Sequence, residues 1–121
     1  MAQTLFFIRH GQTNWNAERR MQGQWESELT DFGRAQARQS AETLRSLGVQ
    51  AIFSSPLRRA RDTAEMIAEA TGLKITYDDR LKEWSAGDWS GHLYADVVSH
   101  WPAEWAAWRD DMWRYRHYRC V

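Results

Sequence analysis

The sequence predicts a three-layer α/β fold, in which a mostly parallel sheet carries helices on both faces. Three short runs rich in β-branched and aromatic residues alternate with two long segments of helical periodicity. The length of 121 residues allows one domain and little more. The apolar fraction of 43% suits a small globular core. Residues 1–121 are therefore expected to form a single domain.

The first strand and the first long helix are expected near the N-terminus. Residues 4–8 are a continuous run of β-branched and aromatic side chains, typical of a strand buried on both faces. A polar loop fills residues 11–29, and Thr30 is a candidate N-cap for a helix over residues 31–47. Gly48 stands where a C-terminal glycine belongs. One face of this helix repeats apolar residues at helical spacing, namely Ala37, Ala41, Leu44 and Leu47.

A second strand and helix follow, and then a third strand. Residues 49–53 read as a short strand. Ser55 is expected to cap the next helix, with Pro56 at its first position and Gly72 at its end. Residues 73–77 form the third strand. Two such strand–helix units favour a parallel sheet.

A tryptophan-rich region follows Leu81. Four apolar residues fall on one face of a helix that starts after Pro102, and this stripe is expected to pack on the core. They are Trp101, Trp105, Trp108 and Met112. Residues 113–121 have no recognisable period and form an atypical tail.

Charge and cysteine content exclude several classes of protein. Sixteen Lys and Arg balance sixteen Asp and Glu, which argues against a nucleic-acid or membrane-surface binder. All basic residues except Lys74 and Lys82 are Arg, which suits phosphate recognition. The lone Cys120 excludes an internal disulfide framework and a cysteine-based zinc site. Without a visible targeting or membrane-spanning segment, a cytoplasmic protein is expected.

The first strand runs directly into Arg9-His10-Gly11. The carboxyl end of a parallel strand faces the crevice in which α/β sheets bind ligands. His10 can act there as a nucleophile through one ring nitrogen if another group holds the second. Gly11 is expected to let the backbone turn and approach an anion closely.

Three arginines, Arg58, Arg59 and Arg61, follow the second strand in the first turn of a helix. The helix dipole disfavours cations there, so an anionic ligand offers an explanation. Helix N-terminal amides together with the Arg59 guanidinium predict a phosphate pocket. Arg58 and Arg61 are expected to be solvated surface residues.

Glu83 follows the third strand, beside Trp84 and ahead of the turn Gly87-Asp88-Trp89-Ser90-Gly91. We expect this carboxyl to be half-buried, which would keep it protonated near neutral pH as a general acid requires.

Taken together, four motifs in order resemble the histidine phosphatase superfamily, which contains cofactor-dependent phosphoglycerate mutases and broad-specificity phosphatases. The first includes Ile8-Arg9-His10-Gly11-Gln12-Thr13. The motifs lie within residues 8–23, 29–37, 54–64 and 81–91, and the resemblance extends over residues 4–112.

The resemblance implies roles for individual residues. His10 would become phosphohistidine, Arg9 and Arg59 would bind the phosphate, and Glu83 would protonate the leaving alcohol and then activate water. Asn16, Gln22 and Gly23 would contact a small phosphorylated substrate. Two guanidiniums neutralise a dianionic phosphoryl group, so no metal or cofactor is expected.

The sequence also departs from the family pattern. The family has a second catalytic histidine in a Ser-His-Gly-Gly-like motif, on a strand beside the first one, and no such motif occurs up to Val121. In Val98-Ser99-His100 the next residues are Trp101-Pro102 rather than glycines, so His100 is not expected to serve. We hypothesise that a frameshift near residue 114 truncated a longer phosphatase. The C-terminal part of the sheet would then be missing, and its exposed edge could form a homo-oligomer.

The expected function is phosphoric-monoester hydrolysis through a phosphohistidine at His10, impaired by truncation. One alternative is a phosphoglycerate mutase-type phosphotransferase. Another is a catalytically dead domain that binds a phosphorylated ligand or a partner. A nucleic-acid or membrane module built on the Trp/Arg tail is the least favoured alternative.

Overall fold

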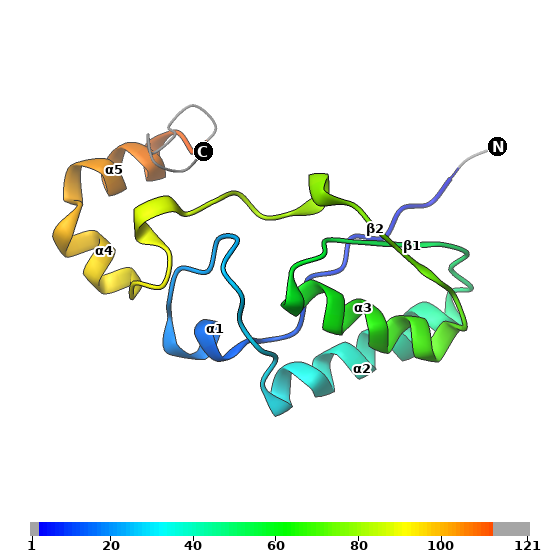
Figure 1. Cartoon of the computed structure of the whole chain (residues 1–121). Coiled ribbons are helices and arrows are strands. Elements are labelled where there is room, and N and C mark those ends of the chain that lie inside the picture. The colour runs from blue at the N-terminus through cyan, green and yellow to red at the C-terminus, as the bar shows by residue number, and fades with distance from the viewer. Residues whose placement is uncertain (1–2, 113–121) are drawn as a thin grey trace.

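The structure of the protein is a computed structural model that describes residues 3–112. Two parts lie side by side in Figure 1: α2, α3, β1 and β2 form one, and α1, α4 and α5 form the other. We call them the α/β part and the tryptophan-rich part. No helix within residues 3–112 is long and apolar enough to cross a membrane.

The α/β part contains the predicted helices and two of the predicted strands. Its elements are α2 (Asp31–Ser46), β1 (Ile52–Ser54), α3 (Arg58–Thr71) and β2 (Ile75–Tyr77). The strands pair in parallel, with Ile52 opposite Ile75. As predicted, the Thr30 side chain caps α2 by accepting a hydrogen bond from the Gly33 amide. Gly72 ends α3 in the left-handed conformation, with φ of 73°.

Helix α3 begins two residues later than predicted. Its N-cap is Leu57, whose side chain makes no capping bond. The Ser55 hydroxyl instead accepts a hydrogen bond from the Leu57 amide at 3.2 Å. The amide of Arg58 donates to a carboxylate oxygen of Glu26 at 2.8 Å, so an acidic side chain from the preceding loop satisfies the helix start.

The core of the α/β part lies between the two helices and one face of the sheet. Its buried residues are Ala41, Leu44, Ile52, Ala64 and Ile67. Along β1, Ile52 and Ser54 are buried, whereas Phe53 between them is 67% exposed. Both helices therefore cover the same sheet face, below the strands in Figure 1. The prediction of helices on both faces is not met by the described residues, which supply no second helical layer.

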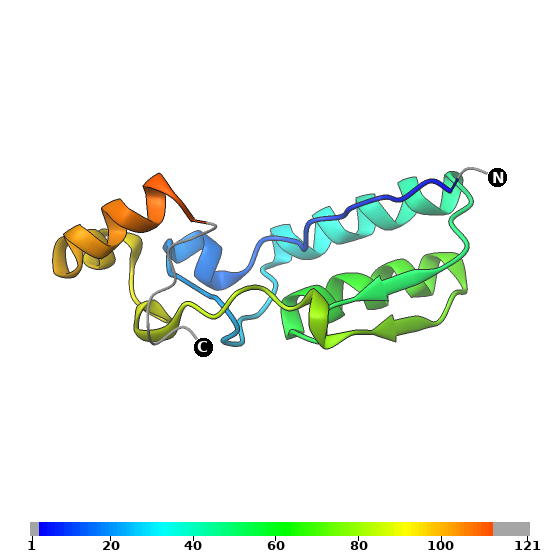
Figure 2. The ribbon, with the colours of Figure 1, turned by 90° about the horizontal axis from the view of Figure 1, so that it is seen from above.

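The prediction of a buried strand over residues 4–8 is wrong for this structure. These residues are extended but pair with no other strand among residues 3–112. Leu5 is 75% exposed and Phe7 is 92% exposed. Phe6 and Ile8 line a hollow together with Leu44 of α2, and Figure 2 shows the segment running along that helix. A central parallel strand needs partners at both edges, and the described residues provide none.

The tryptophan-rich part contains α1 (Asn14–Glu18), α4 (Tyr94–His100), α5 (Pro102–Asp110) and the 3₁₀ turn η2 (Gly87–Trp89). Another 3₁₀ turn, η1 (Asp79–Leu81), follows β2 in the α/β part. Trp89 is fully buried, and Trp101, Trp105 and Trp108 pack against its cluster. The predicted stripe is confirmed for these three residues, whereas Met112 is 55% exposed. These tryptophans pack on a second core, formed by Met21, Ala86, Trp89 and Val97, and not on the core beneath the sheet.

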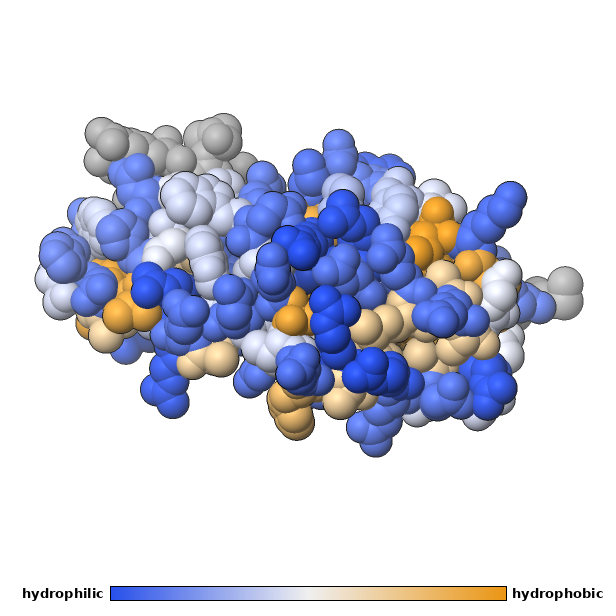
Figure 3. All heavy atoms as spheres, turned by 60° about the horizontal axis from the view of Figure 1, so that its bottom comes forward, coloured by the Kyte–Doolittle hydropathy of each residue, from blue (hydrophilic) through white to orange (hydrophobic). Residues whose placement is uncertain are grey.

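Hydrophilic side chains cover most of the face in Figure 3, and hydrophobic ones gather over the end formed by α2 and α3.

The atypical tail and the hypothesised frameshift fall in residues 113–121, outside the described residues.

Candidate active site

His10 lies where the N-terminal segment meets the start of α2, and its imidazole is half-buried. Its Nδ1 lies 2.7 Å from the carbonyl oxygen of Gly11. A carbonyl only accepts hydrogen bonds, so Nδ1 must carry the proton and Nε2 keeps its lone pair. The condition for a nucleophilic histidine, that another group holds the second nitrogen, is therefore present.

The surroundings of His10 favour the uncharged imidazole. Burial lowers the pKa of His10 below its ordinary value of 6.5, and the positive charges of Arg59 and Arg9 lower it further. The hydrogen bond to Gly11 and the negative charge of Glu83 oppose this shift. The neutral form, which a nucleophile needs, is thus favoured at neutral pH. Arg9, Arg59 and Glu83 therefore lie close enough to the imidazole for their charges to affect its pKa.

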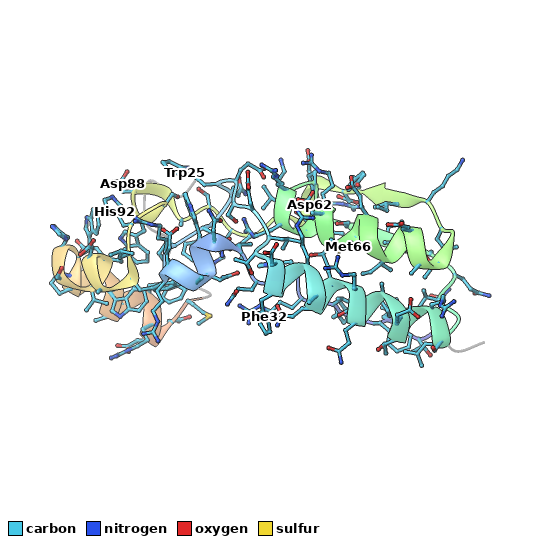
Figure 4. The ribbon with its side chains drawn as sticks, turned by 90° about the horizontal axis from the view of Figure 1, so that it is seen from below. Trp25, Phe32, Asp62, Met66, Asp88 and His92 are labelled. Atoms are coloured by element: carbon cyan, nitrogen blue, oxygen red, sulfur yellow. The ribbon has the colours of Figure 1, made fainter. Side chains whose placement is uncertain are left out.

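A cleft of about 240 Å³ opens beside His10. Its lining residues are Arg9, His10, Gln12, Asn16, Phe32 and Gln36. Figure 4 shows Phe32 at the end of α2 that faces α1. A larger hollow of about 410 Å³ lies along α2, but its lining side chains carry no charge and suit no phosphate chemistry.

Arg59 is buried, with 4% of its surface exposed. Its Nη2 donates to the carbonyl oxygen of Gly23 at 2.6 Å, and its Nη1 donates to that of Trp25 at 3.1 Å. A guanidinium has five N–H donors, so others remain for a ligand. Burial lowers the pKa of Arg59, whereas the charges of Glu83 and Glu26 raise it. Arg59 therefore joins α3 to the loop at residues 23–25.

The start of α3 does not form the predicted phosphate pocket of backbone amides. The Arg58 amide already donates its hydrogen bond to the carboxylate of Glu26. The Arg58 side chain pairs with Glu28 at 2.7 Å and with Asp62 at 3.6 Å. Arg61 lies 3.8 Å from Asp62. These pairs are partly exposed and contribute little stability, in line with the surface role expected for Arg58 and Arg61.

Glu83 is exposed, so the prediction of a half-buried carboxyl is wrong for this structure. One of its carboxylate oxygens accepts a hydrogen bond from the Trp84 amide at 3.0 Å. Its carbonyl oxygen accepts one from the Gln24 side chain at 2.9 Å. The chain between η1 and η2 crosses from one part of the molecule to the other, and no described element covers it (Figure 1).

The other predicted substrate contacts belong to a polar network near α1. The Asn16 side-chain oxygen accepts from the Thr13 amide at 3.0 Å, and Asn16 also lines the cleft. The Gln22 side-chain oxygen accepts from the hydroxyls of Thr13 and Ser27, and Gln22 does not line the cleft. At Gly23, a Cβ would lie 2.6 Å from the Ala86 nitrogen, so this glycine permits a close backbone contact.

Gly11 serves a purpose different from the predicted approach to an anion. A Cβ on Gly11 would lie 2.2 Å from the Gly33 carbonyl oxygen, so the two glycines pack backbone against backbone. This contact sets the His10 segment against the start of α2.

Sequence reasoning missed Thr63, which is buried on α3. Its hydroxyl accepts from the Gly11 amide at 3.1 Å and donates to the Arg59 carbonyl at 2.8 Å. The sequence signal that could have indicated Thr63 is a hydroxyl residue on the apolar face of a predicted helix.

Of the other histidines within residues 3–112, neither His92 nor His100 lines this cleft. His100 is exposed on α4, and its Nδ1 lies 2.8 Å from the Asp96 carbonyl oxygen. Residues 3–112 contain no group of His, Cys, Asp and Glu that could hold a metal ion.

Comparison with known proteins identifies the family. Residues 5–119 match the histidine phosphatase superfamily, branch 1. The chain belongs to this superfamily. The predicted resemblance is thereby confirmed. Two of the four motifs, within residues 8–23 and 29–37, supply the residues that line the cleft, whereas Arg59 and Glu83 are not among those lining residues.

Curated histidine phosphatase relatives are similar over most of this chain. The glucosyl-3-phosphoglycerate phosphatase of Mycobacterium tuberculosis is 46% identical over 110 residues, which cover 91% of this chain and 49% of the relative. A probable phosphoglycerate mutase of Salmonella arizonae is 53% identical over 83 residues, covering 69% of this chain and 39% of the relative. The chain thus spans about half the length, or less, of these relatives.

Solved structures show the same partial match. A mycobacterial glucosyl-3-phosphoglycerate phosphatase in complex with VO3 has a TM-score of 0.80 at 46% identity, covering 84% of this chain and 51% of that one. YhfR of Bacillus stearothermophilus has a TM-score of 0.80 at 36% identity, covering 92% and 55%. The α/β fold with a small parallel sheet therefore corresponds to about half of a histidine phosphatase.

Proposed function

We propose that this chain carries out phosphoric-monoester hydrolysis through a phosphohistidine at His10. The observation that carries the proposal is the hydrogen bond from Nδ1 to the Gly11 carbonyl, which leaves Nε2 as a neutral nucleophile. In the first step, Nε2 forms a bond to phosphorus while the bond from phosphorus to the ester oxygen breaks. In the second step, water attacks the phosphohistidine and releases inorganic phosphate and the imidazole.

Charged residues near His10 are assigned to the rest of this reaction. Arg9 and Arg59 neutralise the phosphoryl oxygens, on which negative charge spreads during transfer. Glu83 donates a proton to the leaving alcohol and then takes one from the attacking water. Asn16, Gln22 and Gly23 are proposed to position the substrate, with Asn16 reaching it through the cleft. No metal or cofactor is assigned to these steps.

The proposed substrate is a small phosphorylated metabolite that carries a glycerate or sugar group. Support comes from relatives named as glucosyl-3-phosphoglycerate phosphatases, which match over 91% of this chain. Hydrolysis is preferred to mutase-type transfer because the relatives named phosphatases match over 91% of this chain, whereas the probable phosphoglycerate mutase matches over 69%. A catalytically dead domain that binds a phosphorylated ligand is the alternative, and the open surroundings of Glu83 favour it.

Activity is expected to be low in the 121-residue chain. A complete three-layer sheet would provide a second histidine as a donor to the phosphoryl group, and the loss of one such donor costs roughly 10²–10³ in rate. Loss of the neighbouring strand would loosen the position of His10, which can cost about 10² more. We expect turnover at least ~10⁴-fold below that of an intact relative.

Transfer of phosphate to the protein tests the proposal directly. The purified, mass-verified chain is incubated with p-nitrophenyl phosphate, and intact mass reports an acid-labile phosphoryl adduct. We expect the adduct in the wild type and in His100→Ala, and none in His10→Ala. An equal adduct in His10→Ala would contradict the proposal. Phosphate binding without any adduct would identify the chain as a binding domain.

Self-association is a further part of the proposal. The extended segment at residues 4–8 leaves its backbone unpaired within residues 3–112, and Leu5 and Phe7 are exposed. The sequence has zero net charge, so two copies do not repel strongly. We propose that a second copy pairs along this segment, since antiparallel pairing of identical strands is self-complementary. Sedimentation velocity at rising concentration tests for the dimer.

A further inference from the structure

Thr63 makes an unusual pair of hydrogen bonds at the centre of the site. The side chain is buried, with 4% of the residue exposed. Its Oγ1 accepts from the Gly11 amide at 3.1 Å, across 52 positions in the sequence, and donates to the Arg59 carbonyl at 2.8 Å. One hydroxyl has one hydrogen and two lone pairs, so both bonds form at the same time.

These bonds connect the nucleophile to the phosphate-binding arginine. The Gly11 amide contacts Thr63, and the Gly11 carbonyl accepts the Nδ1 proton of His10. At the other end, Thr63 bonds to the backbone of Arg59, whose guanidinium is fixed on the carbonyls of Gly23 and Trp25. The imidazole is therefore linked to α3 by hydrogen bonds on both sides of Gly11, whose backbone joins them.

The segment that carries His10 has few other ties. Within residues 3–112, the backbone of residues 3–10 makes no hydrogen bond, so Gly11 is the first backbone group to be anchored. The anchor to α3 is a single hydroxyl. The next residue, Gln12, is tied to α2 through Gln36 and Thr30.

We propose that Thr63 is a positioning residue for phosphoryl transfer, which holds the imidazole of His10 at a fixed place relative to the Arg59 guanidinium. This inference rests on the proposed function. In-line attack requires the nucleophile and the bound phosphate to be aligned, and a misplacement of about 1 Å can cost roughly 10² in rate. Thr63 does not line the cleft, and its hydrogen bonds go to the backbone of Gly11 and Arg59 rather than to the imidazole.

A matched control lies on the same helix. Thr71 also donates to the carbonyl four residues earlier, that of Ile67, at 2.8 Å. It accepts a weak bond from the nearby Leu73 amide at 3.4 Å, but it has no bond to the His10 segment. Loss of the Thr71 hydroxyl therefore reproduces the local change in α3 without the long-range tie.

The experiment compares Thr63→Val, Thr63→Ser and Thr71→Val. The rate of phosphoryl adduct formation from p-nitrophenyl phosphate is measured against ester concentration, which separates the maximal rate from the half-saturating concentration. We expect Thr63→Val to lower the maximal rate by about 10² with little change in half-saturation. Thr63→Ser keeps the hydroxyl and should stay within about threefold of wild type, as should Thr71→Val.

A second readout does not depend on turnover. Titration of the His10 imidazole by ¹H–¹⁵N NMR reports its pKa and which nitrogen holds the proton. If the imidazole drifts from the Arg59 charge in Thr63→Val, the pKa of His10 rises towards its ordinary value. Thr63→Ser and Thr71→Val should leave the titration unchanged.

The outcomes separate the two proposals. Equal rates and equal titrations in Thr63→Val and Thr71→Val would overturn the positioning role. A loss in Thr63→Ser as large as that in Thr63→Val would also overturn it, because packing of the methyl group would then be responsible. If the wild type forms no adduct, the proposed function fails while the titration still tests Thr63. If Thr63→Val does not fold, Thr63→Ala takes its place.

Discussion

The two parts of the molecule close their cores in different ways. The α/β part has small aliphatic residues between two helices and one face of the sheet, and leaves the opposite face open at Phe53. The tryptophan-rich part surrounds Trp89 with Met21, Ala86 and Val97 and leaves that indole fully buried. A parallel sheet needs neighbours at its edges and on both faces, whereas helices close through side-chain contacts alone. The cleft beside His10 takes its lining residues from both parts, Asn16 from α1 and Phe32 and Gln36 from α2.

Arg59 belongs to both parts, which explains why the site lies where they meet. It comes from α3, yet its guanidinium bonds to the loop that packs against Ala86 in the tryptophan-rich part. Trp25 of this loop packs against Gly91, where a Cβ would lie 3.2 Å from the indole ring. The position of the Arg59 guanidinium, to which we assign phosphate binding, thus depends on contacts with the tryptophan-rich part, while His10 lies against the start of α2.

The largest effect on this comparison is expected from Trp89→Ala. Truncation of a fully buried indole should lower the free energy of unfolding by about 3–5 kcal/mol. Urea denaturation followed by circular dichroism measures it. Trp84→Ala is the control, because Trp84 is 39% exposed and should cost clearly less. Equal losses would mean that the tryptophan cluster is not the core of its part. Separate transitions would show that the two parts unfold independently.

Arg59→Lys should have the next largest effect. Lysine keeps the charge but lacks the planar fork that bonds to Gly23 and Trp25 and leaves donors for phosphate. The rate of adduct formation should fall by roughly 10²–10³, as for the loss of one transition-state donor. Arg58→Lys is the matched control, since Arg58 pairs with surface acids and should change the rate little. A similar loss in both variants would contradict the assignment of Arg59.

A smaller effect is expected from pH, through His10. Its pKa is lowered in the folded protein, mainly by burial. Below about pH 6.5 the unfolded chain holds a proton on this imidazole that the folded chain does not yet hold. Stability from this group should therefore decrease as pH falls from about 6.5 towards the folded pKa. Urea midpoints at several pH values measure it, and His10→Gln should remove this part of the slope. An unchanged slope in that variant would contradict the burial of His10.

The smallest effect on stability is expected from Phe7→Lys. Phe7 is 92% exposed, so the free energy of unfolding should change by no more than about 0.5 kcal/mol. The same change should weaken self-association, because charges at an edge oppose strand pairing. Phe6→Lys is the control, since Phe6 lies in the hollow along α2 and its loss should destabilise the monomer. A dimer that survives Phe7→Lys would exclude pairing through this segment.

Sequence reasoning succeeded where a structure depends on local signals. Thr30 caps α2 and Gly72 ends α3 as predicted, because caps and helical period act over a few residues. The prediction of a strand at residues 4–8 was wrong because strand pairing requires partners far along the chain. The prediction of a half-buried Glu83 was wrong as well, because the exposure of a side chain depends on how distant segments pack and not only on its neighbours in the sequence.

The sequence motifs indicate the charged groups of the candidate site, whereas the contacts that hold these groups in place could not be predicted. His10 and the arginines stand in motifs that indicate phosphate chemistry, and the structure brings them within electrostatic reach of one another. The contact between Gly11 and Gly33 and the bonds of Thr63 join segments 22 and 52 positions apart. Periodicity and spacing carry no information about such contacts.

The fixed guanidinium of Arg59 has a consequence for the entropy of ligand binding. Fixing an arginine side chain removes rotamer entropy worth about 2 kcal/mol. Here the side chain is ordered by two carbonyl oxygens as the chain folds, before any phosphate arrives. Calorimetry should therefore record anion binding without the entropy loss that a surface arginine would add. If Arg59 binds a small oxyanion, its affinity depends on how rigidly the loop at residues 23–25 is held. Thermal loosening of this loop should therefore weaken binding at a temperature below that at which the helices unfold.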